Sequence, residues 1–156
     1  MITGMSGAGK SSVIEELRRR GYPAIDTDDG DWREWREDGV PEPGWVWREE
    51  RIHALLEEEH PRPLFVSGTE SNQGQFYPRF DAVVLLTAPL ETLLERVATR
   101  QNNPYGKRAE ERAEIVQYVG WVEPLLRAGC THEIDTSRSD IGQVTDQLVA
   151  IAEGRG

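Results

Sequence analysis

The sequence predicts an α/β fold, in which a parallel sheet is covered by helices on both faces. Short apolar segments typical of buried strands alternate with segments whose apolar residues recur at helical spacing. The first strand runs into a glycine-rich segment, MITGMSGAGKSS. Ligands of parallel sheets bind beyond the carboxyl ends of the strands. We therefore expect the functional residues at this edge of the sheet.

Strands are expected where short apolar runs are bounded by turn residues. The run 81–87 is almost continuously apolar, which suits a parallel strand covered on both faces. The five expected strands lie at residues 1–3, 22–25, 63–67, 81–87 and 131–136.

Helices are expected between these strands. Gly21 should end the first helix, and Pro124 predicts a kink or break inside the longest one. Residues 29–44 are rich in Trp, Gly and Pro and are expected to be irregular. The expected helices span residues 10–20, 46–59, a segment from Pro89 onward, a longer segment after the turn at 102–106, and 140–153.

Length and charge limit the classes of function. A chain of 156 residues suits one domain, 1–156, and the net charge of −10 argues against nucleic-acid or membrane-surface partners. The charge is uneven: residues 26–59 hold 13 acidic and 4 basic side chains, whereas 96–112 hold 5 basic ones. A basic patch on an acidic protein predicts a local anion site.

The sequence favours a cytoplasmic protein. Cys130 is the only cysteine, so no internal disulfide can form and a reducing compartment fits best. The apolar runs are too short to span a bilayer, and the chain enters the glycine-rich segment without room for a signal peptide. Either a monomer or a homodimer is compatible with these features.

The segment Gly4 to Ser11 has the spacing of a P-loop, with two glycines around four residues followed by Lys-Ser. Its glycines let several backbone N–H groups point at one phosphate chain, and the following helix adds its positive end. Lys10 would reach the β- and γ-phosphates, and the Ser11 hydroxyl would bind Mg²⁺. The expected nucleotide-binding residues here are Gly4, Ser6, Gly7, Ala8, Gly9, Lys10, Ser11 and Ser12.

Two carboxylates, Asp26 and Asp28, follow the second expected strand at spacing i, i+2, which directs them to the same side. One could hold Mg²⁺ through water while the other accepts a proton from a hydroxyl nucleophile. A solvated acidic turn is the alternative. Their place beside a P-loop favours the catalytic interpretation.

The chain resembles the shikimate-kinase and gluconate-kinase branch of the P-loop kinases over nearly its whole length. The P-loop, AIDTDD, VVLLTAPLETLLERVATR and PLLRAGCTHEIDT carry the resemblance. It implies a three-layer α/β/α P-loop NTPase fold with strand order 2-3-1-4-5, an acceptor-covering segment at about 29–60 and a lid at about 101–110. By the same resemblance, Asp28 would be the base that contacts the acceptor and Asp26 would support the metal.

The basic residues of the expected lid region take their roles from the same resemblance. Arg100 would stack on adenine, and Lys107 or Arg108 would neutralise the transferring phosphoryl group. Surface charges on a helix are the alternative for each of them.

Departures from the family concern the acceptor. Shikimate kinases carry an arginine where this chain has Val122, and a Gly-Gly-Gly run where it has Ser67-Gly68-Thr69; Arg48 matches a carboxylate-binding arginine of the family. Loss of one carboxylate anchor makes shikimate an unexpected substrate. Gly68 and Arg48 stay candidate acceptor residues.

Aromatic side chains are concentrated in the acceptor-covering segment. Trp32 and Trp35 could stack on a planar acceptor, whereas Trp45 and Trp47 could instead anchor the segment to the core. Arg33 and Arg36 could bind an anionic acceptor but are expected to pair with neighbouring carboxylates. Glu70, just past the third strand, is a further candidate to bind a metal-bound water.

These features predict an ATP- and Mg²⁺-dependent kinase that phosphorylates a hydroxyl group of a small molecule. A neutral or weakly anionic acceptor is favoured, because the acceptor segment has four arginines among many acids. One alternative is a nucleoside or nucleoside monophosphate kinase. Another, of a different class, is an ATP-binding switch that has no acceptor.

Overall fold

The computed structural model describes residues 1–155. Its centre is a five-stranded parallel sheet with the order β2-β5-β1-β6-β7, which is the expected 2-3-1-4-5 when these strands are counted along the chain. Register pairs include Ile2 with Ser67 and with Val84. The strands are β1 (Ile2–Gly4), β2 (Ala24–Asp26), β5 (Phe65–Ser67), β6 (Val84–Thr87) and β7 (His132–Asp135).

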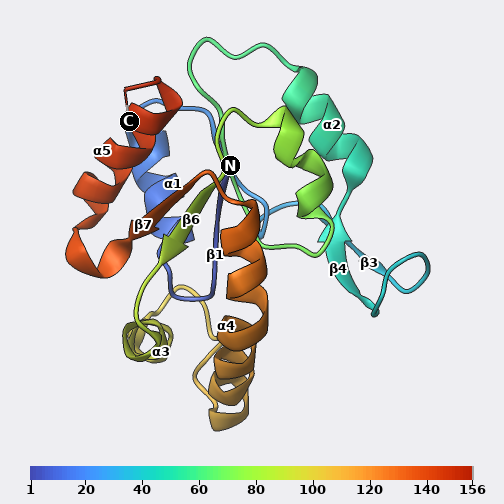
Figure 1. The fold of residues 1–156 in the computed structure, drawn as a ribbon, viewed down its shortest axis with the longest axis vertical. Coiled ribbons are helices and arrows are strands. Elements are labelled where there is room, and N and C mark those ends of the chain that lie inside the picture. Colours follow the sequence, from blue (N-terminus) through green and yellow to red (C-terminus); the bar gives the residue numbers. More distant parts are fainter. Residues whose placement is uncertain (156) are drawn as a thin grey trace.

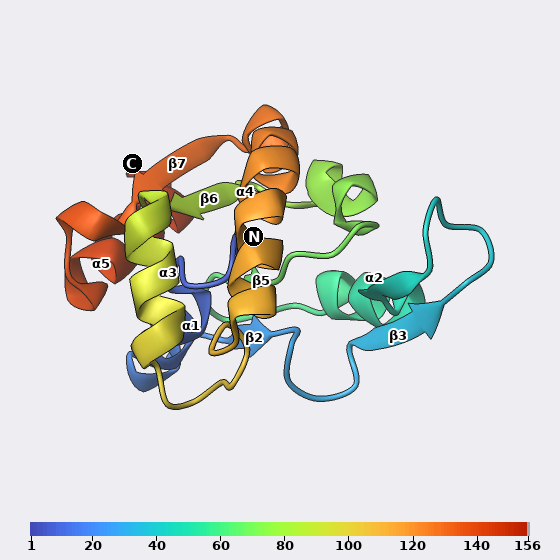
Figure 2. The same ribbon diagram turned by 90° about the horizontal axis from the view of Figure 1, so that it is seen from below.

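Helices cover both faces of the sheet, as the sequence predicts (Figure 1). The first and last helices, α1 and α5, pack together on one face, while α3 and α4 pack together on the other (Figure 2). The long helices are α1 (Lys10–Arg19), α2 (Glu49–Glu57), α3 (Leu90–Thr99), α4 (Ala109–Gly129) and α5 (Ile141–Ala152).

The buried apolar side chains form two clusters. Phe65 packs with α1 and α5, whereas its neighbour Val66 packs with α2 and the 3₁₀ helix η1 (Gln73–Arg79). Trp47 is fully buried in this second cluster, against Phe76. The first cluster also contains Leu93 of α3 and Leu126 of α4, so it packs helices from both faces against the sheet, and the second cluster attaches α2 and η1.

The segment expected to be irregular contains a β-hairpin instead. Strands β3 (Arg33–Arg36) and β4 (Gly44–Trp47) pair antiparallel and project beside α2 (Figure 2). Consequently α2 begins at Glu49, three residues later than predicted, and Trp47 belongs to a strand. The Trp and Val residues of these strands have high β-propensity, but the surrounding Gly, Pro and acidic residues mask this signal in the sequence.

Of the kink or break predicted at Pro124, the break is wrong, because α4 runs as one helix from Ala109 to Gly129 with the proline inside it. Proline disrupts a helix through its missing N–H and a clash with the carbonyl four residues earlier. That earlier residue is Gly120, and the Pro124 ring is exposed. Because this part of α4 is exposed, water can bind the Gly120 carbonyl oxygen that Pro124 leaves without a partner, which lowers the energetic cost of the proline. The sequence also did not predict the 3₁₀ helix η1, between β5 and β6.

Across residues 1–155, no helix has both the length and the apolar composition needed to cross a bilayer.

Candidate nucleotide and acceptor site

The connection between β1 and α1 has the backbone of a phosphate cradle. Gly7 and Gly9 have φ angles of 85° and 105°, a left-handed region that favours glycine. A Cβ at Gly7 would lie 2.7 Å from the Leu93 carbonyl oxygen, so the loop packs closely on α3. A Cβ at Gly9 would meet nothing within 4 Å, so the loop is open on that side. The sequence therefore folds into a tight turn that has room for a ligand.

Lys10 closes over this loop. Its Nζ donates hydrogen bonds to the carbonyl oxygens of Gly4, at 2.5 Å, and Met5, at 3.2 Å. Burial lowers the pKa of Lys10, and the charges of Asp28 and Asp26 oppose that shift. The ammonium group thus sits between the cradle and the carboxylates that follow β2, where it can move to an anion.

Ser11 and the end of β2 form an oxygen-rich pair. The Ser11 hydroxyl donates to the Asp26 carboxylate at 2.9 Å, and the Asp28 N–H donates to its other oxygen at 3.0 Å. Asp26 is 6% exposed, so this pair is fixed inside the edge of the sheet. Hydroxyl and carboxylate oxygens are ligands that Mg²⁺ prefers, usually together with phosphate oxygens. The residues present therefore fit a Mg²⁺–nucleotide site.

A cavity of about 530 Å³ opens over the cradle. It extends from the P-loop to α3 and to the segment after β7, and Asp28 lies at its rim. Arg100, at the end of α3, faces this cavity and donates to the Tyr105 carbonyl oxygen at 2.7 Å. All residues from Ser6 to Ser12 line it. The volume suits a nucleotide-sized ligand.

Arg96 is a site residue that the sequence analysis missed. Its guanidinium donates to the Gly7 carbonyl oxygen at 3.1 Å and to the Thr136 hydroxyl at 2.8 Å. Thr136 in turn donates to the Ala8 carbonyl oxygen at 3.0 Å. These bonds tie the P-loop to α3 and to the end of β7. The sequence did contain a signal for Arg96, because it lies one helical turn before Arg100 and therefore on the same face of the helix.

The two basic residues expected in the lid point elsewhere. The Lys107 ammonium caps the end of α3, donating to the carbonyl oxygens of Ala98, at 2.8 Å, and Arg100. Arg108 is exposed and lies 3.8 Å from Glu110 at the start of α4. Neither one lines the cavity in this structure. A phosphate contact from either residue would require the segment 101–108 to move.

On the expected acceptor side, Arg33 of the hairpin lies between Asp28 and Glu70. One Arg33 nitrogen lies 3.6 Å from an Asp28 oxygen and 3.4 Å from a Glu70 oxygen. Burial raises the pKa of Glu70 to about 7, while Arg33 opposes that shift. Arg33 therefore links the two carboxylates. Arg36 likewise pairs with Glu34 at 2.6 Å, so both arginines meet neighbouring carboxylates as expected.

Arg48 and Gly68 have contacts within the chain. Arg48 lies 3.1 Å from Asp31 and 3.3 Å from Glu34. The Gly68 N–H donates to the Ile2 carbonyl oxygen, and a Cβ at Gly68 would lie 2.3 Å from the Thr27 hydroxyl oxygen. The absence of a side chain at Gly68 is therefore explained by packing.

The four tryptophans of the acceptor-covering segment have different environments. Trp32 packs on the core, with the Arg51 guanidinium 4.4 Å from its ring centroid. Trp35 and Trp45 are both 53% exposed and meet edge to face on the hairpin. Buried Trp47 donates to the Thr27 hydroxyl at 2.9 Å and anchors the hairpin. Neither Trp32 nor Trp35, the two expected to stack on an acceptor, lines the cavity over the cradle.

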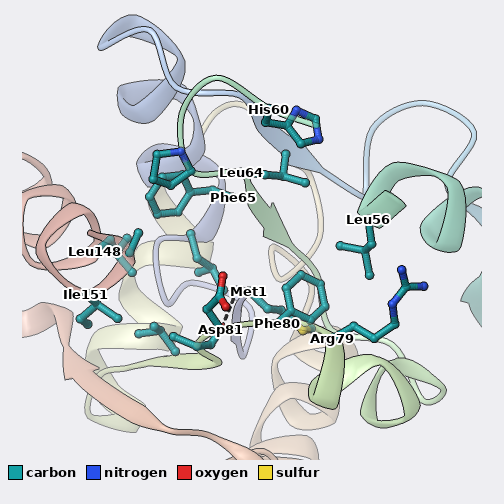
Figure 3. A pocket seen from close by; sticks show the side chains of 15 residues that line it. Met1, Leu56, His60, Leu64, Phe65, Arg79, Phe80, Asp81, Leu148 and Ile151 are labelled. Atoms are coloured by element: carbon teal, nitrogen blue, oxygen red, sulfur yellow. Dashed lines mark hydrogen bonds between the residues drawn. The ribbon is translucent and has the colours of Figure 1, made fainter. Parts of the chain in front are cut away.

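A second cavity, of about 190 Å³, lies at the opposite, amino edge of the sheet (Figure 3). Two of its polar side chains have partners of their own: Arg79 bonds to His53 at 2.6 Å, and His60 lies 3.4 Å from the Leu55 carbonyl oxygen. Parallel sheets bind ligands at the carboxyl edge. The cradle is therefore the better candidate site.

Fold and site together define a P-loop protein with the fold of the small-molecule kinases. A family model described as an AAA domain matches residues 1–117, and the chain belongs to this family.

Several known proteins are similar over nearly the whole chain. A nucleotide-binding protein of Synechococcus sp. (strain JA-2-3B'a(2-13)) is 28% identical over 99% of this chain, which spans only 45% of that relative's length. Shikimate kinase from Acinetobacter baumannii, solved with shikimate, has a TM-score of 0.67 at 19% identity, covering 98% of this chain and 91% of that one. A gluconokinase from Sinorhizobium meliloti 1021 has a TM-score of 0.56 at 21% identity, covering 98% and 92%.

Proposed function

We propose that this protein is an ATP- and Mg²⁺-dependent kinase that transfers the γ-phosphoryl group to a hydroxyl group of a small molecule. The observation that carries the proposal is the position of Asp28. Its carboxylate lies at the rim of the cavity that Lys10 and the P-loop line, and it is about half exposed. A protein that only binds nucleotide would not require a carboxylate there.

Each residue has a role in this proposal. The P-loop N–H groups and Lys10 hold the phosphates, and Ser11 with Asp26 holds Mg²⁺, which neutralises phosphate charge. Asp28 orients the acceptor hydroxyl and takes its proton as the acceptor oxygen bonds to phosphorus and the bond to ADP breaks. Arg96 keeps the cradle in place. Most of the catalysis would come from positioning and charge neutralisation.

A regulatory ATP-binding protein without an acceptor is the second candidate. The curated relatives favour it to some extent, since they are described only as nucleotide-binding proteins and are longer than this chain. Its P-loop and Mg²⁺ site would be the same. The two candidates differ in whether Asp28 matters for turnover. A nucleoside or nucleoside monophosphate kinase is a variant of the first candidate that differs only in the acceptor.

The test compares Asp28→Asn with the wild-type protein. We expect ATP binding, measured by calorimetry, to be retained within about threefold and acceptor-dependent ADP release to fall by about a hundredfold or more. Asp29→Asn is the matched control, because Asp29 is the exposed neighbour. Undiminished turnover by Asp28→Asn would contradict the assignment of the base.

A further inference from the structure

The arginines of the acceptor-covering segment are already paired with carboxylates of the protein. An anionic acceptor is normally bound by arginines that are free to form paired hydrogen bonds with it. In this segment each arginine already lies within ion-pair distance of a carboxylate of the chain. The pairs are Arg33 with Asp28 and Glu70, Arg36 with Glu34 and Glu49, Arg48 with Asp31 and Glu34, and Arg51 with Asp31.

Arg33 is the arginine nearest to the proposed base, and it is held from several sides. Glu70 lies 3.4 Å and Asp28 3.6 Å from the same guanidinium nitrogen. The Trp45 ring centroid lies 5.6 Å from its guanidinium carbon, within the range of a cation–π contact. An anionic group could bind Arg33 only by displacing these partners.

Glu70 is buried and is linked to Asp28 through Arg33. Its side chain is 7% exposed, and its N–H donates to the Gln73 side-chain oxygen at 2.9 Å. The Gln73 amide donates in turn to the Thr3 hydroxyl at 3.1 Å, next to the P-loop. Two carboxylates and one guanidinium therefore share the acceptor side of the site. This arrangement repels a further anion and offers oxygen acceptors to a donor.

We propose that Glu70 determines acceptor specificity: it occupies Arg33 and selects a hydroxyl compound that has no carboxylate or phosphate group. Glu70 is buried and acts through Arg33, while the half-exposed Asp28 carboxylate offers an oxygen acceptor to a hydroxyl or amino group of that compound. This inference rests on the proposed kinase function. It names the substrate class as neutral or amine-bearing polyhydroxyl compounds, including nucleosides and amino sugars.

The experiment measures Mg²⁺-dependent ADP release with chemically matched acceptors. The pairs are adenosine with adenosine 3′-monophosphate, sorbitol with gluconate, and glucosamine with glucosamine 1-phosphate, so that each anionic compound keeps a primary hydroxyl group that its partner also has. We expect kcat/KM for the best neutral or amine-bearing compound to exceed that of its anionic partner by about a hundredfold, because a buried like charge is unfavourable. This comparison in the wild-type protein needs no variant to fold.

Two variants test Glu70 itself. In Glu70→Gln, Arg33 loses a charged partner, so the preference against the anionic compound should fall by about tenfold. In the double variant Glu70→Gln/Arg33→Gln, the preference against the anionic compound should return to the wild-type level. Glu59→Gln is the control, an exposed glutamate beyond α2, and should keep the wild-type preference. The Mg²⁺ dependence should stay unchanged in Glu70→Gln, whereas a metal-water ligand would shift it.

The possible outcomes distinguish a failure of the Glu70 inference from a failure of the proposed kinase function. A wild-type preference for the anionic compounds, or an unchanged preference in folded Glu70→Gln, overturns the inference and leaves the kinase intact. ATP binding without turnover of any acceptor overturns the proposed function, and the inference with it.

Discussion

The Ser11 hydroxyl donates a hydrogen bond to the Asp26 carboxylate at 2.9 Å, joining the first turn of α1 to the end of β2. These residues are 15 positions apart in the chain, and parallel pairing of the strands brings them to one edge. The bond places two oxygen ligands for Mg²⁺ directly beside the phosphate cradle.

Asp26→Asn should impair Mg²⁺-dependent turnover. The amide is a weaker ligand than the carboxylate, so we expect kcat/KM to fall by about a hundredfold and the Mg²⁺ concentration for half-maximal rate to rise. A Mg²⁺ titration of ADP release measures both effects. Asp38→Asn, at an exposed position on the hairpin loop, should change neither. An unaltered Mg²⁺ requirement in Asp26→Asn would remove this residue from the metal site.

Gly7→Ala should destabilise the P-loop. The added Cβ would be strained at a φ of 85° and would approach the Leu93 carbonyl oxygen to 2.7 Å. We expect a loss of at least about 2 kcal/mol in the free energy of unfolding. Gly39→Ala, with φ of 73° and nothing within 4 Å, controls for the strain alone. Equal melting temperatures for the two variants would show that the contact with α3 does not matter.

Glu70 should make stability depend on pH. Burial raises its pKa from 4.5 to about 7, so the folded protein binds this proton more tightly than the unfolded chain does. The stabilising contribution is complete below 4.5 and is lost as the pH rises to about 7. Glu70→Gln should remove this slope, on the order of 3 kcal/mol in total. Urea unfolding of both proteins between pH 4.5 and 8 measures it; parallel pH profiles would refute the burial argument.

Pro124→Ala should stabilise the protein. The substitution restores an N–H that can bond to the Gly120 carbonyl oxygen, in a helix that is already continuous. We expect a gain of about 1 to 3 kcal/mol, seen as a higher melting temperature. Pro43→Ala, outside any helix or strand, provides the comparison. A lower melting temperature in Pro124→Ala would show that the proline supports this helix rather than weakening it.

The sheet and the phosphate cradle could be predicted from sequence because each depends on a local signal. Val84 to Thr87 forms one strand of the central sheet, and the glycines at 4, 7 and 9 alone permit the turn. Both kinds of signal are contained within about ten residues. Strand order then followed from the resemblance to a known family.

The acceptor side could not be predicted in the same way, because its geometry depends on contacts between distant segments. Arg33 meets Glu70 across 37 positions, and Arg96 meets Gly7 across 89. The hairpin that carries Arg33 has no simple apolar alternation, since its Trp45 is exposed while Trp47 is buried. Only the packed structure shows which charges neutralise one another.

The most direct test of the central claim is acceptor-dependent release of ADP from MgATP, with Lys10→Ala as the blank. The account predicts that one class of small hydroxyl compound raises the rate at least about tenfold above the ATPase background, and that Lys10→Ala abolishes the increase. ATP that binds tightly while no compound raises the rate in the wild-type protein would contradict the claim and favour a nucleotide-binding regulator.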